Sequence, residues 1–312
     1  MLDPWLSIDE HLRAELHNAL HQRDPPIEAD ILRVPPGPGA LHVERSGHGG
    51  EQIVLIHGFG TSSFLWRSIA PALATDGHTA YAVDLLGYGE SDRPFDADYT
   101  LGAQAECLDR ALSWLRLSRV SLDGIDIGAA VAMQLLVSRP ARVARLALVN
   151  PVALDELPGG DVRAIQRGTA KFALRVGRGI LGAAALLTPV LEGSVADPRS
   201  MPPRLVARYL APFVGSDGVS HLLTLARSVR REDLEGLDPG KIQVPTLIVW
   251  AEEDRWVDSG FGERLQAMIA GSTLVRLPGV GRLVPEEASD SLSRLLLEFI
   301  VQHATPTSAP SA

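Results

Sequence analysis

Cysteine and lysine are almost missing from this chain of 312 residues. The single cysteine, Cys107, excludes an internal disulfide framework and any multi-cysteine metal site. It falls in a helical pattern, where we expect a buried, small and apolar role. The two lysines, Lys171 and Lys241, stand beside 27 arginines, a skew typical of a GC-rich coding sequence. The formal net charge of −9 and the absence of a basic run exclude a general nucleic-acid-binding protein.

Long hydrophobic runs are also scarce. The longest strongly apolar stretch, residues 179–191, is too short to span a bilayer and contains Pro189. Residues 1–20 include acidic side chains early and lack the apolar core of a signal peptide. We therefore expect no membrane partner and a cytoplasmic location. No motif requires a metal or another cofactor, so none is expected.

The spacing of apolar residues predicts an α/β fold. Residues 7–23 have helical spacing, which makes residues 1–26 an N-terminal helical extension. Two short strand-like runs, 29–34 and 40–47, flank a turn rich in proline and glycine and predict a hairpin. The continuous apolar run at 52–60 is typical of a strand buried on both faces.

Further along, strands and helices alternate, which indicates right-handed crossovers and a mostly parallel sheet of eight strands with helices on both faces. The expected helices cover residues 64–75, 101–116, 127–139, 259–270 and 287–302. Residues 152–236 have helical patterns without a convincing strand, and we interpret them as a helical cap inserted after the sixth strand. The core then consists of residues 27–151 and 237–303, and a disordered tail follows at 304–312.

The segment Gly124-Ile125-Asp126-Ile127-Gly128 lies between a predicted strand and a predicted helix. A strained strand-to-helix turn needs small residues two positions on either side of its apex, and Gly124 and Gly128 meet that need. The helix N-terminus places the Ile127 N–H beside the Asp126 carboxylate. Because aspartate is a favoured N-cap, the alternative is that Asp126 only caps this helix.

Further segments occupy the carboxyl ends of predicted strands, where ligands bind in such sheets. They are HGFG at 57–60, DLLGYGESDRP at 84–94, VPTLIVWAEEDRWVD at 244–258 and LPGVGRLVPEEASD at 277–290. Together with Asp126, these segments resemble the α/β-hydrolase superfamily over about residues 27–303. The chain order of Asp126, Asp254 and Arg282 matches the family order of nucleophile, acid and third member.

An aspartate at this turn narrows the resemblance to haloalkane dehalogenases, fluoroacetate dehalogenases and epoxide hydrolases. The resemblance implies that Asp126 attacks carbon to form an ester. It also implies an oxyanion hole made by the N–H groups of Phe59 and Ile127, and an Asp254 that orients the third member. In these families a histidine then activates the water that hydrolyses the ester. Here the histidine position holds Arg282.

Arg282 changes the expected chemistry. A guanidinium stays protonated at any working pH and cannot take a proton from water, so an ester on Asp126 would persist. We expect instead a charge-assisted row of Asp126, Arg282 and Asp254. The neighbours of Asp126 depart from the dehalogenases as well, since Ile127 stands where Trp or Arg is usual and Ile125 where His is frequent.

These residues leave three hypotheses open. In the first, Asp126 acts as base, acid or hydrogen-bond acceptor and Arg282 positions an anionic or carbonyl group, which suits elimination, cyclisation or isomerisation in secondary metabolism. In the second, His221 supplies the missing base in a hydrolase of epoxides, haloalkanes or esters, although a single histidine on an amphipathic helix is more often packed or at the surface. In the third, the protein only binds a ligand, and the ion pairs of Asp126, Arg282 and Asp254 only stabilise the fold.

The cap is rich in small and aliphatic residues, which favours a mostly apolar pocket. Tyr209 lies in the region from which epoxide hydrolases supply a tyrosine, although simple packing is the commoner role. The residues expected at the pocket are His57, Phe64, Trp66, Ile125, Tyr209, His221 and Trp256. His57 is usually structural in the family, and Trp66 also suits the core. The expected partner is a small hydrophobic substrate, and a homodimer is the assembly considered.

Overall fold

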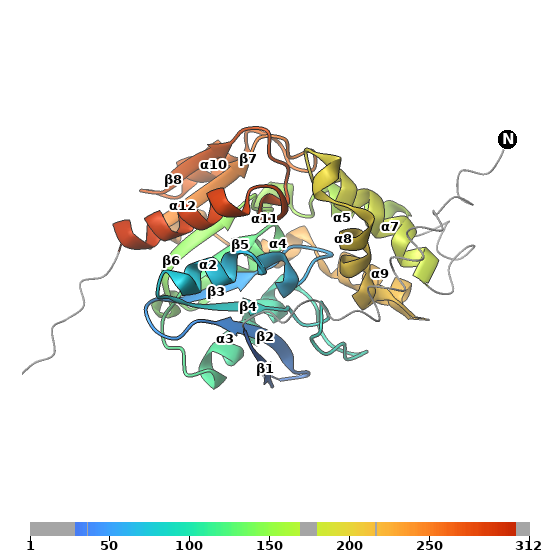
Figure 1. The fold of residues 1–312 in the computed structure, drawn as a ribbon, viewed down its shortest axis with the longest axis horizontal. Helices are drawn as coiled ribbons and strands as arrows, with labels where there is room; N and C mark the ends of the chain where they lie inside the picture. Colours follow the sequence, from blue (N-terminus) through green and yellow to red (C-terminus); the bar gives the residue numbers. More distant parts are fainter. Residues whose placement is uncertain (1–28, 36, 169–179, 216, 304–312) are drawn as a thin grey trace, which may run out of the picture.

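The computed structural model describes residues 29–303 except residue 36, residues 169–179 and residue 216 (Figure 1). The predicted N-terminal extension at 1–26, with its helix at 7–23, lies outside the described residues, as does the predicted tail at 304–312. Within the described part, one sheet forms the centre and a group of helices lies at one end of it (Figure 1).

The eight strands pair in the order β1-β2-β4-β3-β5-β6-β7-β8. They are β1 (Asp30–Val34), β2 (Leu41–Ser46), β3 (Gln52–Ile56), β4 (Thr79–Val83), β5 (Val120–Ile125), β6 (Val143–Val149), β7 (Thr246–Ala251) and β8 (Thr273–Leu277). β1 and β2 form the predicted hairpin, with Asp30 opposite Arg45, and β2 is also antiparallel to β4. All other pairs are parallel, so the predicted mostly parallel, eight-stranded sheet is confirmed.

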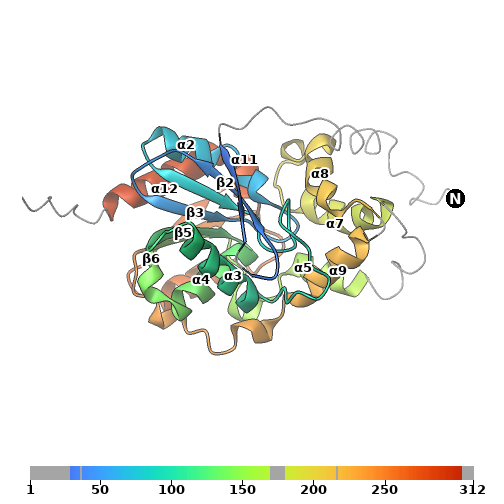
Figure 2. The ribbon, with the colours of Figure 1, turned by 90° about the horizontal axis from the view of Figure 1, so that it is seen from below.

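Helices cover both faces of this sheet (Figure 2). α2 (Ile69–Thr75) packs against α12 (Ser289–Gln302) on one face, and α3 (Leu101–Trp114) packs against α4 (Ile127–Ser138) on the other. α10 (Phe261–Met268) contacts β7 and β8, and the short α11 (Val284–Glu287) precedes α12. Every residue of β4, β5 and β7 is buried, which explains their largely apolar sequences. Cys107 in α3 is buried, as predicted.

The described chain between β6 and β7 forms helices and no strand. The longer helices there are α5 (Gly160–Gly168), α7 (Ile180–Gly193), α8 (Pro203–Leu210) and α9 (Gly218–Ser228), which gather at one end of the sheet (Figure 1). α8 buries Val206, Tyr209 and Leu210 on one side, as an amphipathic helix does. These helices form the cap. No helix of the described residues combines the length and the apolar character needed to cross a membrane.

Glu287, in the segment after β8, joins the cap to the rest of the fold. Its carboxylate accepts hydrogen bonds from the backbone N–H groups of Ala196, Asp197 and Gly281 at 2.6–3.0 Å. Ala196 and Asp197 follow a cap helix, whereas Gly281 directly precedes Arg282. The position of Arg282 therefore depends on both the cap and the sheet.

Candidate active site

Asp126 occupies the sharp turn between β5 and α4. Its backbone has φ 57° and ψ −124°, a conformation that costs a non-glycine residue about 1–3 kcal/mol and persists only where the surroundings enforce it. A Cβ atom at Gly124 would lie 2.5 Å from the carbonyl oxygen of Gly128, and a Cβ at Gly128 would lie 2.4 Å from that of His57. Only glycine fits at these two positions, which is what the motif predicts.

The carboxylate of Asp126 does not cap the helix that follows it. It accepts no hydrogen bond from the first turn of α4, the Ile127 N–H included, so the N-cap alternative is wrong. Oδ2 instead accepts the Phe59 N–H at 2.8 Å, and Oδ1 accepts a hydrogen bond from Nη2 of Arg282. A Cβ at Gly58 would lie 2.8 Å from Oδ2, so this close approach also requires glycine.

Arg282 lies inside a buried group of three carboxylates, with its side chain 2% exposed. Besides its bond to Asp126, Nη2 lies 3.7 Å from Oδ2 of Asp161, and Nη1 lies 4.0 Å from Oδ1 of Asp254. The three residues of the expected row therefore come together, although the contact with Asp254 is long. Nη1 has no hydrogen-bond partner among the described residues.

Asp161, the second residue of α5, is a member of this group that sequence reasoning missed. Its side chain is buried, and Oδ1 has no hydrogen-bond partner in the described part of the chain. Gly159 leaves room for it, since a Cβ there would lie 2.5 Å from Oδ1 of Asp161 and 3.3 Å from Nη2 of Arg282. The sequence signal is a Gly-Gly-Asp helix start, which is equally typical of an ordinary helix N-terminus.

Asp254 follows β7 and is held by its neighbours. Oδ2 accepts a hydrogen bond from Nδ2 of Asn150 at 3.0 Å, and Oδ1 accepts the Trp256 N–H at 2.8 Å. Oδ1 of Asn150 in turn accepts the Ala251 N–H at 2.8 Å. The indole N–H of Trp256 donates to the Ser194 hydroxyl, which belongs to the cap. The Asp254 carboxylate is thus fixed between the ends of β6 and β7.

Burial and charge set the acid–base properties of the group. Burial raises the pKa of Asp126 to about 6; the Arg282 charge opposes this rise, the Asp161 charge adds to it, and the Phe59 N–H opposes it. Burial alone lowers the pKa of Arg282, but the carboxylates of Asp126, Asp161 and Asp254 outweigh it and raise that pKa above its ordinary value. The guanidinium therefore stays charged, whereas burial holds the pKa of Asp126 above the ordinary carboxyl range.

Tyr88, in the stretch after β4, is a second residue that the sequence does not single out. Its ring packs against His57 and Phe59, with centroid distances of 5.1 and 6.1 Å. Burial raises the pKa of its hydroxyl well above the usual value, and the charges of Asp126 and Asp161 raise it further. The phenol therefore stays neutral and lies within the electrostatic reach of both carboxylates.

The two histidines expected near the site are engaged elsewhere. His57 is buried, where Nδ1 donates to the Gly58 carbonyl at 2.7 Å and Nε2 accepts the Leu85 N–H at 3.0 Å. Burial lowers its pKa, which keeps the ring neutral. Nε2 of His221 donates to the Gly87 carbonyl at 2.6 Å, and its ring packs with two aromatic side chains. Neither ring bonds to Asp126 in the described structure.

Some of the apolar residues expected at the pocket contact the cap, and others lie in the core. Phe64 and Tyr209 pack edge to face at 5.9 Å, and the Tyr209 hydroxyl donates to Glu286. Trp66 has no exposed surface, which places it in the core rather than at the mouth of a pocket. Ile125 is also fully buried, at the end of β5. Contacts of these residues with a ligand stay predictions.

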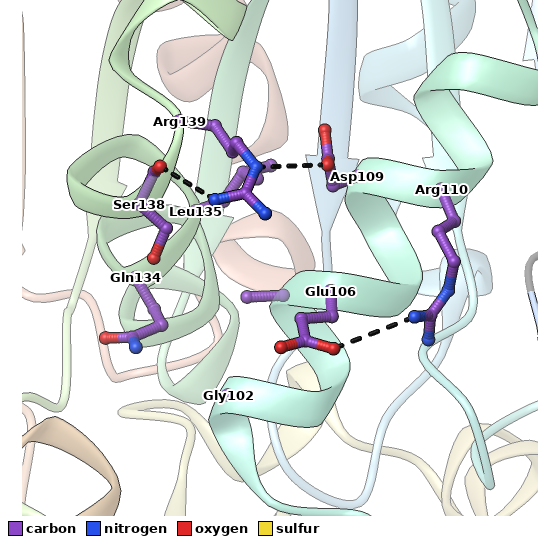
Figure 3. A pocket seen from close by; sticks show the side chains of 9 residues that line it. Gly102, Glu106, Asp109, Arg110, Gln134, Leu135, Ser138 and Arg139 are labelled. Atoms are coloured by element: carbon purple, nitrogen blue, oxygen red, sulfur yellow. Dashed lines mark hydrogen bonds and ion pairs between the residues drawn. The ribbon is translucent and has the colours of Figure 1, made fainter.

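A surface hollow of about 260 Å³ lies between α3 and α4 (Figure 3). Its charged side chains pair with one another: Glu106 lies 3.6 Å from Arg110, and Asp109 lies 3.5 Å from Arg139. It also lies along the sides of two helices and not at the carboxyl ends of the strands, where ligands bind in such folds. We therefore place the candidate active site at Asp126.

Comparison with known proteins assigns a family to this architecture. Residues 52–289, which include the Asp126 turn and Arg282, match the sequence model of the α/β-hydrolase fold. The chain belongs to the α/β-hydrolase fold family. The resemblance expected from the sequence is confirmed at this level, whereas Asp126 as nucleophile and Arg282 in place of a catalytic histidine stay predictions.

Individual α/β-hydrolase relatives include several kinds of hydrolase. A 2-hydroxy-6-oxononadienedioate/2-hydroxy-6-oxononatrienedioate hydrolase from Klebsiella pneumoniae is 29% identical over 278 residues, 84% of this chain and 91% of the relative. A haloalkane dehalogenase from Mycobacterium marinum is 32% identical over 176 residues, 55% of each chain. The crystal structure of an α/β-hydrolase fold protein from Burkholderia ambifaria matches with a TM-score of 0.78 and 29% identity, covering 89% of this chain and all of the other.

Proposed function

We propose that this α/β-hydrolase-fold protein is an enzyme that moves protons on a small hydrophobic molecule. The step is non-hydrolytic, such as an elimination, cyclisation or isomerisation in secondary metabolism. Asp126 is the acid–base residue and Arg282 is its cationic partner. The observation that supports this proposal is the hydrogen bond from Arg282 to Oδ1 of Asp126, at the position where the resemblance to dehalogenases and epoxide hydrolases implies a histidine.

Both oxygens of the Asp126 carboxylate are engaged, which disfavours attack on carbon. Oδ2 accepts the Phe59 N–H and Oδ1 accepts Arg282, so a nucleophilic attack has to break a buried, charge-assisted hydrogen bond. An ester formed in spite of this has no proton acceptor in Arg282 to activate water. Loss of general-base assistance slows a reaction by about 10²–10⁴-fold.

Proton transfer suits the same carboxylate. Its pKa, raised by burial to about 6, lies near a neutral working pH, where acid–base catalysis is most efficient. In an isomerisation, Asp126 takes a proton from one substrate carbon and a proton is returned to another atom, so no water is consumed. A guanidinium N–H stabilises the charge that develops on a carbonyl oxygen. The three carboxylates around Arg282 disfavour an anionic substrate group and favour such a carbonyl.

A hydrolase is the second candidate function, and two observations favour it. The relatives from Klebsiella pneumoniae and Mycobacterium marinum are named as a hydrolase and a dehalogenase. The strained turn at Asp126 and the Phe59 N–H also retain a geometry suited to covalent attack. In that case Asp126 attacks an epoxide, a haloalkane or an ester, and a base other than Arg282 completes the reaction. A protein that only binds its ligand is the third candidate.

Isotope exchange separates these functions. The purified protein is incubated with apolar ketones in D₂O and, in parallel, with epoxides, haloalkanes and esters in H₂¹⁸O. We expect exchange of carbon-bound hydrogen in the ketones, slowed about 10²-fold or more by Asp126→Asn. The matched control is Asp123→Asn, which changes a second buried aspartate, located on β5, and should keep the wild-type rate.

The opposite results identify the alternatives. Halide, diol or acid release with ¹⁸O in the product contradicts the proposal and indicates a hydrolase. A stable mass increase on Asp126 indicates a nucleophile that stalls at the ester. Ligand binding without exchange or hydrolysis indicates a binding protein.

A further inference from the structure

Asp161 carries a carboxyl group that the predicted chemistry does not use. Its Oδ2 lies 3.7 Å from Nη2 of Arg282, the same nitrogen that donates to Oδ1 of Asp126. Its Oδ1 is buried without a hydrogen-bond partner among the described residues. Two carboxyl groups from different parts of the chain, one on the Asp126 turn and one in the first turn of α5, therefore share one guanidinium nitrogen.

The buried cluster around Arg282 contains more acidic than basic side chains. Asp126, Asp161 and Asp254 face the single charge of Arg282, and none of the four side chains is more than 5% exposed. Both carboxyl oxygens of Asp254 accept hydrogen bonds from N–H donors, Nδ2 of Asn150 and the Trp256 backbone. The excess charge therefore falls on Asp126 and Asp161, because two neighbouring carboxylates in a poorly solvated site cannot both ionise without a large cost.

The other titratable groups around the pair do not supply a second positive charge within the described part of the chain. Tyr88 and His57 are neutral, for the reasons given above. On α5 itself, Arg163 directs Nη1 to the Pro158 carbonyl at 2.6 Å and forms no ion pair with Asp126 or Asp161 among the described residues. On α9, which packs against α5, His221 is bonded to a backbone carbonyl, and burial lowers its pKa.

We propose that Asp161 is the second acid–base residue of this site, and that Asp126 and Asp161 share one proton, with both carboxyl groups next to Nη2 of Arg282. The role of this pair in catalysis rests on the proposed function. The sharing of one proton between the two carboxyl groups is independent of it. One member of the pair is a carboxylate that can take a proton from a substrate carbon. The other is a carboxylic acid that can give a proton to a second substrate atom.

The proton balance of such a turnover closes without a co-reactant. When Asp126 removes the substrate proton and Asp161 supplies one, the proton held by the pair has moved from Asp161 to Asp126. Asp126 then releases this proton to solvent and Asp161 takes one up, which restores the starting state with no net consumption of protons, water or an oxidant. The charge of Asp161 raises the pKa of Asp126, which couples the two carboxyl groups.

The shared proton is measured on the full-length protein without any substrate. Aspartate carrying ¹³C at Cγ is followed by NMR as the pH changes, in an Asp123→Asn background. That background is needed because burial raises the pKa of Asp123 to about 7, which overlaps the expected signal. We expect a raised titration that disappears in Asp126→Asn. We also expect Asp161→Asn to lower the pKa of Asp126 by at least one unit, a tenfold loss of proton affinity.

A second variant keeps the test valid if Asp161→Asn does not fold. Gly159→Ala places a Cβ 2.5 Å from Oδ1 of Asp161 but 3.3 Å from Nη2 of Arg282, so the Asp161 carboxyl group has to move further and the pKa of Asp126 should also fall. The matched control is Asp197→Asn, which removes the same charge from an exposed cap loop and should leave the titration unchanged.

The pairing is overturned if Asp126 titrates in the ordinary carboxyl range in the wild-type background. It is also overturned if both Asp161→Asn and Gly159→Ala leave the titration of Asp126 unchanged. These results differ from a failure of the proposed function. A raised, Asp161-dependent titration without any deuterium exchange in ketones upholds the pairing and contradicts only the proposed reaction. Deuterium exchange that depends on Asp126, together with an Asp126 titration that is unchanged by substitution of Asp161, contradicts only the pairing.

Discussion

Arg67 and Glu286 form a two-pronged ion pair, with Nη1–Oε1 at 2.7 Å and Nη2–Oε2 at 2.6 Å. Arg67 follows the short helix Ser63–Trp66, and Glu286 lies in α11, close to Arg282. The hydroxyl of Tyr209, on the cap helix α8, donates to the same carboxylate. Glu286 therefore links the cap to the segment that carries Arg282, as the hydrogen bonds of Glu287 also do.

Glu286→Gln is expected to lower the free energy of unfolding by about 1–3 kcal/mol. The substitution keeps the shape of the side chain but leaves the guanidinium of Arg67 without its counter-charge. Tyr209→Phe removes a single hydrogen bond to the same carboxylate and should cost about 1 kcal/mol. Urea unfolding of both variants measures the difference. Equal stability of Glu286→Gln and the wild type would show that the ion pair between Arg67 and Glu286 does not stabilise the fold.

Gly128→Ala should destabilise the fold by at least about 2–3 kcal/mol, because the new Cβ would lie 2.4 Å from a backbone oxygen that cannot move freely. Gly102 is the matched control. It also lies in a helix, α3, but a Cβ there meets no atom within 4 Å. Gly102→Ala should therefore raise stability by up to about 1 kcal/mol. Thermal unfolding compares the two variants, and a mild effect at Gly128 would contradict the crowded turn.

Asp123 is expected to make stability depend on pH. Burial raises its pKa to about 7, with the Arg145 charge opposing the rise, whereas the unfolded chain has an ordinary carboxyl pKa. The folded state then binds a proton that the unfolded state releases, so stability is lost as pH rises from about 4 towards 7. Asn at position 123 cannot ionise. At pH 8, Asp123→Asn should therefore avoid a loss of unfolding free energy on the order of 3–4 kcal/mol that the wild type suffers. Urea unfolding at pH 5 and pH 8 measures this, and a variant no more stable than the wild type at pH 8 would contradict it.

The reaction should require Asp126 in its ionised form. The rate of deuterium exchange in a ketone is therefore expected to rise with pH through about 6, the pKa of this buried carboxyl group. Because the Arg282 charge lowers that pKa, Arg282→Met should move the midpoint of the profile to higher pH and slow the exchange. A midpoint that stays in place, or moves down, would show that Arg282 does not act on Asp126 in solution.

Most of the architecture follows from local patterns. The helix expected at 101–116 is observed as Leu101–Trp114, and that expected at 127–139 as Ile127–Ser138. The helix expected at 64–75 is divided instead, with a separate short helix at Ser63–Trp66 before α2. Pro71 accounts for part of this difference, since it has no N–H to offer the carbonyl of Arg67 and an α-helix cannot run continuously through it.

The sequence by itself determined the fold class and the glycine-flanked turn of Asp126, and it placed a permanently charged side chain at position 282. These properties are largely local: they depend on side-chain periodicity, on the close approach of Gly124 to Gly128 and on the basicity of one functional group. Only the tertiary structure decided which groups meet Arg282, because Asp161 reaches it through the placement of the cap on the sheet. The bonds that engage His57 and the Phe59 N–H likewise join residues distant in sequence, and no local pattern specifies such contacts.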